Sequence, residues 1–426
     1  MTPSSEKAIL IVIYSYKFLE FMWNLLELDE FKRFVDVQVW DISSITTPKF
    51  SEGVVVGRSA RNEVITCASM RDYVTRLFAL RRQADHTNIC LLNGIKRSNP
   101  AEFLCELFLV FVLKNKNVKV FDLYNGGVPI VYPKYNENEN DYATQQGSGF
   151  FAKIARFISR MTTLTEAWRA IRASFLIRLS KIVPTALTHR LVAGEQWLSV
   201  AVRDKRHGIR IVKCHSYDFS NHLLAGKASF SQQRIGSKTA VFLSSANPAF
   251  GSDEILMGGD QLFTSEVWYP ALVRFFNFLE SSTGVTVEIA GHYKSAFPAI
   301  APCFGNRPVY YGKTREMVRK SDYVVTIAST AISYAVLFKK PVIFIYSNQL
   351  KNSRNPMQDI YGMAAMLGTK PVNIDEPDIE ISRLLKVNEE KYLDYENACL
   401  TSARSQKPNF QIILEEIMNI RVDKKG

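Results

Sequence analysis

The chain has 426 residues, of which 47% are hydrophobic and 22% charged, a composition that excludes disordered and fibrous proteins. At roughly 100–200 residues per domain, this length predicts two or three domains, each able to bury its own core. The 53 basic and 41 acidic side chains give a net charge of +12. This charge favours an anionic partner: nucleic acid, lipid headgroups or phosphorylated small molecules.

The N-terminal sequence predicts a buried strand rather than a signal peptide, because only Lys7 precedes the short apolar run Ala8–Ile13. No apolar stretch reaches the ~18 uncharged residues that a membrane-spanning helix needs. The longest candidate, Phe103–Leu113, contains Glu106. We therefore expect a cytoplasmic protein.

Apolar runs alternate with helix-like segments through the first part of the chain. Strands are predicted at Ala8–Tyr14, Val35–Trp40, Asn88–Leu92 and Val118–Leu123, and helices at Phe18–Phe34 and Pro100–Leu113. This alternation predicts a parallel sheet with helices on both faces. We take residues 1–225 as an N-terminal Rossmann-like domain.

Positive charge is concentrated in residues 150–190, which hold eight basic side chains and a single acid, Glu166, for a net charge of +7. Lys153, Arg156 and Arg160 share one helical face, and apolar residues occupy the other. Basic amphipathic helices of this kind are typical of peripheral binding to an anionic membrane, here the inner face of the cytoplasmic membrane. The alternative is that they dock on the protein body. Nucleic acid is disfavoured, because bases stack on rings exposed on strands or loops.

A second α/β unit begins near Lys238. Its predicted strands are Thr239–Leu243, Val285–Ala290, Pro308–Tyr310, Tyr323–Ile327 and Pro341–Ile345, and its predicted helices include Trp268–Glu280, Thr314–Lys320 and Ser329–Leu337. We take residues 238–400 as a C-terminal Rossmann-like domain and residues 401–426 as a C-terminal helix. The predicted fold class is α/β: two Rossmann-like domains that face a cleft, with a basic helical insertion in the N-terminal half.

Several motifs that bind cofactors or metals are missing from the sequence. It holds no G-x-G-x-x-G fingerprint, Walker A loop, G-x-S-x-G elbow, H-E-x-x-H helix or D-x-D pair. Its six cysteines are scattered without a C-x-x-C pair, which predicts buried thiols in a reducing compartment. We therefore expect a metal-independent protein without a cofactor.

Polar residues follow two predicted strands of the second domain. His292 closely follows Val285–Ala290, and Ser329 and Thr330 follow Tyr323–Ile327 and open a helix. An imidazole, hydroxyls and the free N–H groups of a helix start all favour a phosphate, and the carboxyl ends of parallel strands share one edge. Taken singly, an ordinary N-cap at Ser329 and a satisfied loop histidine at His292 are the simpler interpretations.

This part of the chain resembles bacterial surface-polysaccharide glycosyltransferases of the GT-B fold. The resemblance is carried by Gly312–Thr314, Ser321–Tyr323, Ser329–Ser333 and Ala335–Pro341. It is similar to the pattern of capsule and lipopolysaccharide sialyltransferases and Kdo transferases. Those families carry an HP motif and a serine–serine motif, both of which bind the phosphate of a nucleotide sugar.

The resemblance implies that His292 takes the role of the HP motif and that Ser329 with Thr330 takes the role of the serine–serine motif. Tyr293 stands where the HP motif has proline, and Thr330 stands where the second serine would be. Lys313 and Arg315, near the same predicted edge, add positive charge for the donor phosphate, although solvated side chains are an equal alternative.

Glycosyl transfer also needs a base that takes the proton of the acceptor hydroxyl. The resemblance implies that in inverting members this base comes from the N-terminal domain. The segment Lys213–Asp218 ends the predicted strand Ile209–Val212, and His215 or Asp218 is our candidate. The alternative is a polar strand end that caps the next helix. Weaker candidates for the base are Glu20, Asp253 and Glu254.

These observations predict a glycosyltransferase that moves a sugar from a CMP- or UDP-linked donor to a cell-surface polysaccharide, such as a capsule or O-antigen, or to a lipid-linked glycan. Residues 150–190 would hold it at the membrane. Two alternatives remain open. One is a nucleotide-sugar 2-epimerase, whose set of carboxylates we do not find, and the other is a non-catalytic membrane-surface scaffold of the same fold.

Overall fold

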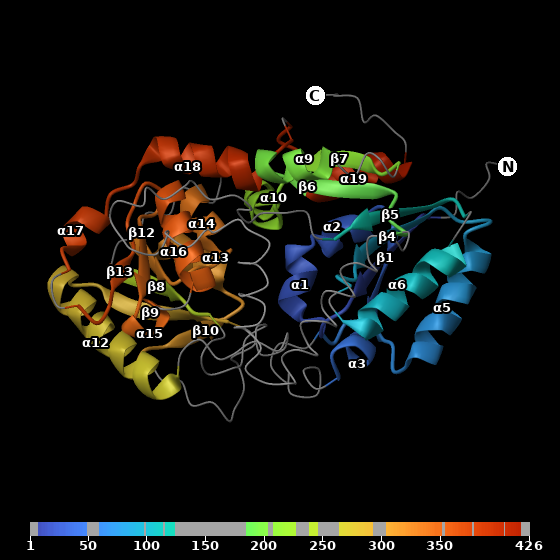
Figure 1. The fold of residues 1–426 in the computed structure, drawn as a ribbon. Coiled ribbons are helices and arrows are strands. Elements are labelled where there is room, and N and C mark those ends of the chain that lie inside the picture. The colour runs from blue at the N-terminus through green and yellow to red at the C-terminus, as the bar shows by residue number, and fades with distance from the viewer. Residues whose placement is uncertain are drawn as a thin grey trace, which may run out of the picture.

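The computed structural model describes residues 7–48, 59–97, 99–113, 116–123, 185–202, 208–226, 238–245, 264–292, 304–351, 354–376, 379–403 and 405–418. These residues form two α/β units that lie side by side, each built on its own parallel sheet (Figure 1). The predicted fold class of two Rossmann-like domains is thereby confirmed. Most of the predicted basic helices fall in residues 150–184, outside the described residues.

The first sheet has seven strands in the order β3-β2-β1-β4-β5-β6-β7. They are β1 (Ile9–Tyr14), β2 (Asp36–Asp41), β3 (Val64–Thr66), β4 (Ile89–Gly94), β5 (Val118–Asp122), β6 (His189–Ala193) and β7 (Arg210–Cys214). Helices cover both faces of this sheet, which explains why β1 and β4 are almost continuously buried.

Two sets of helices pack on the first sheet. The buried side chains of α5 (Met70–Gln83) and α6 (Pro100–Leu113) join one face of β1 and β4 in a single core. The helices α1 (Glu20–Leu25), α2 (Leu28–Lys32) and α19 (Asn409–Met418) cover the other face. The short helices α3 (Ser43–Thr46), α9 (Glu195–Ala201) and α10 (Tyr217–Leu224) complete the first unit.

Two predicted helices of the first unit differ from the structure. The single helix predicted over Phe18–Phe34 is wrong, because Glu27 adopts a left-handed φ of 58° and separates α1 from α2. The helical segment predicted up to residue 190 is wrong at its described end, where His189 and Arg190 open strand β6. Pairing with β7 along its whole length, from His189 to Ala193, favours the extended backbone there.

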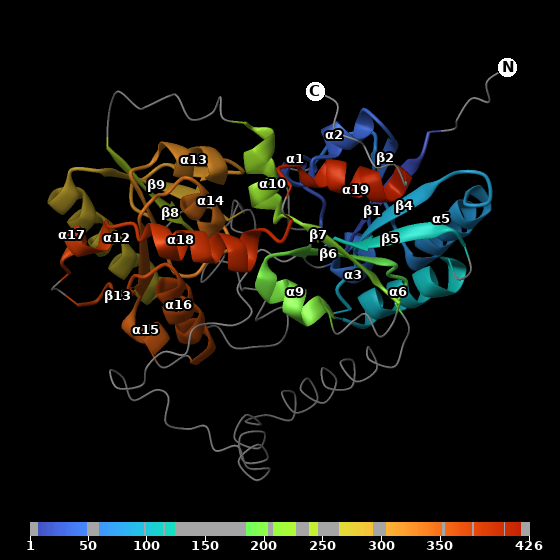
Figure 2. The ribbon, with the colours of Figure 1, turned by 90° about the horizontal axis from the view of Figure 1, so that it is seen from above.

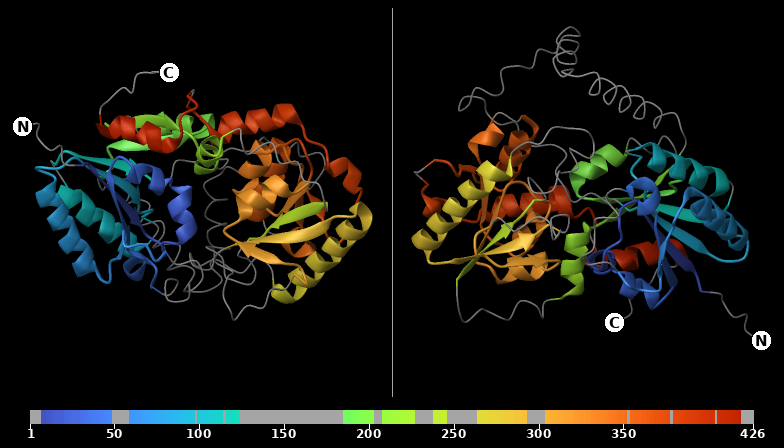
Figure 3. Two further views of the ribbon diagram at one scale, coloured as in Figure 1. Left: turned by 180° about the vertical axis from the view of Figure 1, so that it is seen from behind. Right: turned by 90° about the horizontal axis from the view of Figure 1, so that it is seen from below.

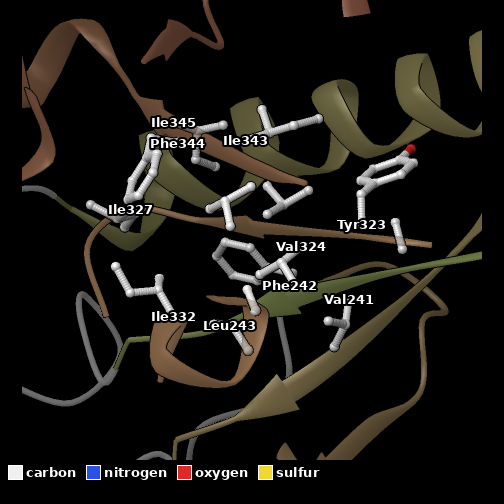
Figure 4. Packing of buried hydrophobic residues seen from close by; sticks show 14 of the residues in the cluster. Val241, Phe242, Leu243, Tyr323, Val324, Ile327, Ile332, Ile343, Phe344 and Ile345 are labelled. Atoms are coloured by element: carbon white, nitrogen blue, oxygen red, sulfur yellow. The ribbon is translucent and has the colours of Figure 1, made fainter. Parts of the chain in front are cut away.

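The second sheet has six strands in the order β10-β9-β8-β11-β12-β13. They are β8 (Thr239–Leu243), β9 (Thr286–Gly291), β10 (Val309–Tyr311), β11 (Tyr323–Thr326), β12 (Val342–Tyr346) and β13 (Val372–Asn373). Figure 4 shows the apolar side chains of β8, β11 and β12 packed together in the core of this unit.

The helices of the second unit cover its sheet in the same way. They are α12 (Ser265–Thr283), α13 (Thr314–Lys320), α14 (Ile332–Leu337), α15 (Asn348–Lys351), α16 (Arg354–Met366), α17 (Ile381–Leu384) and α18 (Glu389–Tyr395). No helix among the described residues is long and apolar enough to cross a membrane.

The C-terminal part of the chain joins the two units. After α18, a π-helical turn (Glu396–Leu400) leads back to the first unit, where α19 packs beside α2 (Figure 2). The backbone N–H of Phe410 at the start of α19 donates a hydrogen bond of 2.9 Å to the buried carboxylate of Glu27. Figure 3 shows this connection from α18 to α19 from behind and from below. This segment therefore fastens one domain to the other.

Candidate active site

The carboxyl ends of the strands in the second sheet lie along one edge, and the predicted phosphate-binding residues follow two of them. Leu243 of β8 pairs with Ala290 of β9 on one side and with Thr326 of β11 on the other. His292 comes directly after β9, and Ser329 comes three residues after the end of β11. These two side chains therefore flank the end of β8, on strands roughly 10 Å apart.

Ser329 and Thr330 form the turn that precedes α14. The hydroxyl of Ser329 accepts a hydrogen bond of 3.2 Å from the N–H of Ala331, and α14 begins at Ile332 rather than at Ser329 as predicted. Ser329 is half-buried and Thr330 is exposed. Since a hydroxyl that accepts one bond still carries its own proton, both residues retain a donor for an anion.

Lys313 lies at the part of the same edge that faces the first domain. It occupies the position before α13, is exposed, and places Nζ 6.0 Å from the centroid of the Tyr310 ring. The preceding residue, Gly312, has a φ of 70°, and a Cβ placed on it would lie 3.9 Å from Cβ of Phe21 on α1. The loop between β10 and α13 therefore lies near α1 of the first domain.

Asp218 lies on α10 of the first domain and reaches across to the second. Its carboxylate accepts a hydrogen bond from the hydroxyl of Ser333 on α14. Burial raises the pKa of Asp218, while hydrogen bonds with Ser333 and Tyr334 oppose that rise. The structure thus brings this predicted base next to the helix that follows Ser329 and Thr330.

His215 lies only three residues before Asp218 but has different partners. His215 is 1% exposed, and its ring Nδ1 lies 2.8 Å from the hydroxyl of Thr401. Its backbone N–H donates a hydrogen bond to the side-chain oxygen of Asn409. The ring stacks on Phe219, and burial lowers its pKa to about 4, so the imidazole is neutral at neutral pH. These contacts pack His215 against Thr401 and Asn409, in the part of the chain that leads from α18 back to the first domain. Its role as the base stays a prediction.

Arg315, in the first turn of α13, brings a second cation to the junction of the domains. Its Nε and Nη2 atoms are shielded from solvent and have no hydrogen-bond partner in the described parts of the chain. The guanidinium lies 5.8 Å from the centroid of the Phe338 ring. Burial, and to a smaller extent the charge of Arg315, lowers the pKa of His222 on α10. An anion bound here would accept hydrogen bonds from donors that are shielded from solvent.

The weaker candidates for the base divide into two groups. Glu20 accepts hydrogen bonds from Ser59, at 2.7 Å, and from Arg61, at 2.8 Å, so its carboxylate is occupied by partners of its own domain. Asp253 and Glu254 lie outside the described residues.

Sequence reasoning did not identify the link between Asp218 and Ser333. Ser333 was visible as the last residue of the Ser329–Ser333 run, but its partner is 115 positions away in the chain. Only the packing of α10 on α14 brings the two side chains together. Among the described residues no cluster of His, Cys, Asp and Glu could hold a metal ion.

Comparison with solved structures finds both glycosyltransferases and epimerases. The chain is 12% identical to the wall teichoic acid polymerase TagF, with coverage of 97% and 90% of the two chains and a TM-score of 0.49. It is 10% identical to a putative UDP-N-acetylglucosamine 2-epimerase from Listeria monocytogenes, with 98% coverage of both chains and a TM-score of 0.46. It is 9% identical to MurG from Acinetobacter baumannii, with coverage of 97% and 100% of the two chains and a TM-score of 0.40.

No protein-family model and no curated protein matches the sequence. The structural likenesses combine identities of 9–12% with TM-scores below 0.5 and do not assign a function to this chain.

Proposed function

We propose that the protein is a glycosyltransferase that binds a nucleotide-sugar donor at the carboxyl edge of the second sheet. The observation that carries this proposal is the gathering of His292, Lys313, Ser329 and Thr330 along that edge, opposite a domain that reaches across with Asp218. In open α/β sheets, ligands bind outside the carboxyl ends of the strands. The cations and hydroxyls found here suit a phosphorylated ligand.

The chemistry that we propose needs two functions, one in each domain. The departing nucleoside phosphate gains negative charge, which donors from His292, Lys313 and the two hydroxyls stabilise without a metal. Asp218 takes the proton of the acceptor hydroxyl as that oxygen attacks the anomeric carbon. Its raised pKa makes the carboxylate a stronger base, and its bond to Ser333 holds it beside the donor edge.

We further propose that the donor is CMP- or UDP-linked and that the acceptor is a cell-surface polysaccharide or a lipid-linked glycan. Support for a membrane-bound acceptor comes from the charge of +7 in residues 150–190. A basic segment of this kind is attracted to the anionic inner face of a membrane.

A thermal-shift panel of CMP, CDP, UDP, GDP and their sugar conjugates tests the donor site. A ligand that binds the native state at ~100 times its Kd adds about 2.7 kcal/mol to stability, which is a visible change in Tm. We expect one nucleotide to stabilise the wild type but not His292→Ala. His86→Ala is the matched control, since His86 is exposed beyond the end of α5. If no nucleotide shifts the wild type, the proposal is wrong.

Turnover separates the alternatives. A glycosyltransferase releases nucleotide from its donor when an acceptor glycan is added, and Asp218→Asn should abolish this release without loss of the thermal shift. An epimerase would act on the donor without an acceptor. A scaffold of the same fold would bind the nucleotide and never turn it over.

A further inference from the structure

Helix α6 exposes an apolar face to solvent. Phe111 is 70% exposed and Leu104 is 47% exposed. Together with the partly exposed Leu107 and Phe108, they occupy positions i, i+3, i+4 and i+7, so they lie on one side of the helix. A surface helix normally presents polar residues there, and a continuous apolar face marks a site of interaction.

Helix α5 extends this face. The hydroxyl of Tyr73 bonds the carbonyl of Cys105 at 3.2 Å, and the guanidinium of Arg81 bonds the carbonyl of Val112. The two helices therefore run parallel and in step, as Figure 1 shows on the side of the first domain away from the second. Phe78, between those two contacts on α5, is 45% exposed. It places a third large apolar side chain level with the C-terminal half of α6, between Phe108 and Phe111.

Two exposed arginines lie on the α5 side of the apolar face. Arg71 and Arg82 lie seven and four residues from Phe78, on the same side of α5, and both are exposed. The two acids of α6, Glu102 and Glu106, are buried on its other side, at 0% and 2% exposure. Arg76 pairs with Asp72 and Lys116 pairs with Asp85, while Arg81 donates to the carbonyl of Val112.

We propose that this face of α5 and α6 docks on an anionic lipid bilayer. The side chains of Leu104, Phe108, Phe111 and Phe78 enter the boundary between headgroups and acyl chains, while Arg71 and Arg82 contact lipid phosphates. A second copy of the chain fits less well, because the same face offers Arg71 and Arg82 no available acid: Glu102 and Glu106 are buried, and Asp72 is paired with Arg76. Nucleic acid would leave the apolar centre facing phosphates.

The apolar face lies close to the carboxyl edge of the first sheet. Helix α6 begins six residues after β4 ends at Gly94, and the side chain of Asn99, just before α6, bonds the carbonyl of Thr46 in α3. The apolar face thus starts near the carboxyl edge of the first sheet. A protein docked through it holds that edge near the membrane surface, within reach of a lipid-linked molecule. The inference does not depend on the donor site proposed above.

The test measures the partition coefficient of the full-length protein on vesicles of phosphatidylcholine with about one-third phosphatidylglycerol. We expect the double variant Leu104→Ser, Phe111→Ser to bind at least about tenfold more weakly. The double variant Arg71→Gln, Arg82→Gln should lose about fivefold per arginine. The matched controls are Leu393→Ser, at a 58% exposed position on α18, and Lys351→Gln with Lys386→Gln, also in the second domain.

Independent contacts multiply in a partition coefficient, so the effect of this face is visible whether or not residues 150–190 also bind. Equal binding of the wild type and the Leu104, Phe111 variant would overturn the proposal. So would a wild type that does not bind these vesicles, or one that binds pure phosphatidylcholine equally well. A wild-type dimer that the same variant converts to a monomer, with no change in lipid binding, would assign the face to self-association instead.

Discussion

Replacing Glu27 with Gln is expected to change how the stability of the protein depends on pH. Glu27 separates α1 from α2 and is 3% exposed, and its Oε2 accepts the N–H of Phe410 at the start of α19. Its other carboxylate oxygen, Oε1, is buried without a hydrogen bond in the described parts of the chain. Burial raises the pKa of this carboxyl from 4.5 to about 7.

The sign and size of the effect follow from that pKa. The folded protein holds the proton of Glu27 up to about pH 7, whereas the unfolded chain releases it near pH 4.5. The stability that this proton contributes is therefore complete below pH 4.5 and is lost as the pH rises through 7. At 1.36 kcal/mol per pH unit, the loss is about 3 kcal/mol. Gln keeps an oxygen for the N–H of Phe410 and carries no charge at any pH.

Urea unfolding of wild type and Glu27→Gln, followed by tryptophan fluorescence between pH 5 and 8.5, measures this difference. We expect the variant to gain about 2–3 kcal/mol on the wild type across that range. Glu389→Gln is the matched control, because Glu389 is a 73% exposed surface partner of Lys339, and its curve should run parallel to the wild type. Parallel curves for Glu27→Gln as well would show that Glu27 is ionised in the folded protein, and the reasoning would be refuted.

Two further substitutions test buried contacts made by the first domain. Gly194→Ala should cost roughly 1–3 kcal/mol in thermal unfolding, because Gly194 has a φ of 79° and a Cβ there would lie 2.4 Å from the Ala398 carbonyl oxygen. Gly208→Ala, at a φ of 71° but with nothing within 4 Å, should cost less, and an equal loss would contradict the clash. Lys17→Met should cost about 3–5 kcal/mol in urea, because it leaves the carboxylate of Asp41, 1% exposed and 3.3 Å away, without its counter-charge. Adding Asp41→Asn should recover part of that loss, and no recovery would show that the ion pair is not the cause.

Local pattern determined most of the secondary structure. The predicted helices Pro100–Leu113 and Thr314–Lys320 and the predicted strand Thr239–Leu243 have the same bounds in the structure. Pro100–Leu113 and Thr239–Leu243 are apolar runs, and Thr314–Lys320 begins directly after the turn residues Gly312 and Lys313. The rhythm of these elements was enough to predict two parallel sheets, since a parallel strand pair needs a long crossover between its strands.

The candidate site was only partly accessible to the same reasoning. That His292 and Ser329 follow strands of one parallel sheet could be predicted from their places in the chain, because parallel strands end at one edge. The position of Asp218 could not. Its partner Ser333 belongs to the other domain, and no sequence period connects residues that meet through the packing of two helices.

The sequence by itself determined the two α/β units and the set of polar residues at their strand ends, because both arise from short-range periodicity. Tertiary structure alone decided where the helix over Phe18–Phe34 breaks. Glu27 takes its left-handed turn in contact with the start of α19, which is 383 positions away along the sequence. Tertiary structure also decided which apolar residues of α6 are left in solvent. The sequence of a helix that is apolar on all sides does not reveal which face its neighbours cover. Only the packing of α6 against α5 and the first sheet determines that Phe111 stays in solvent.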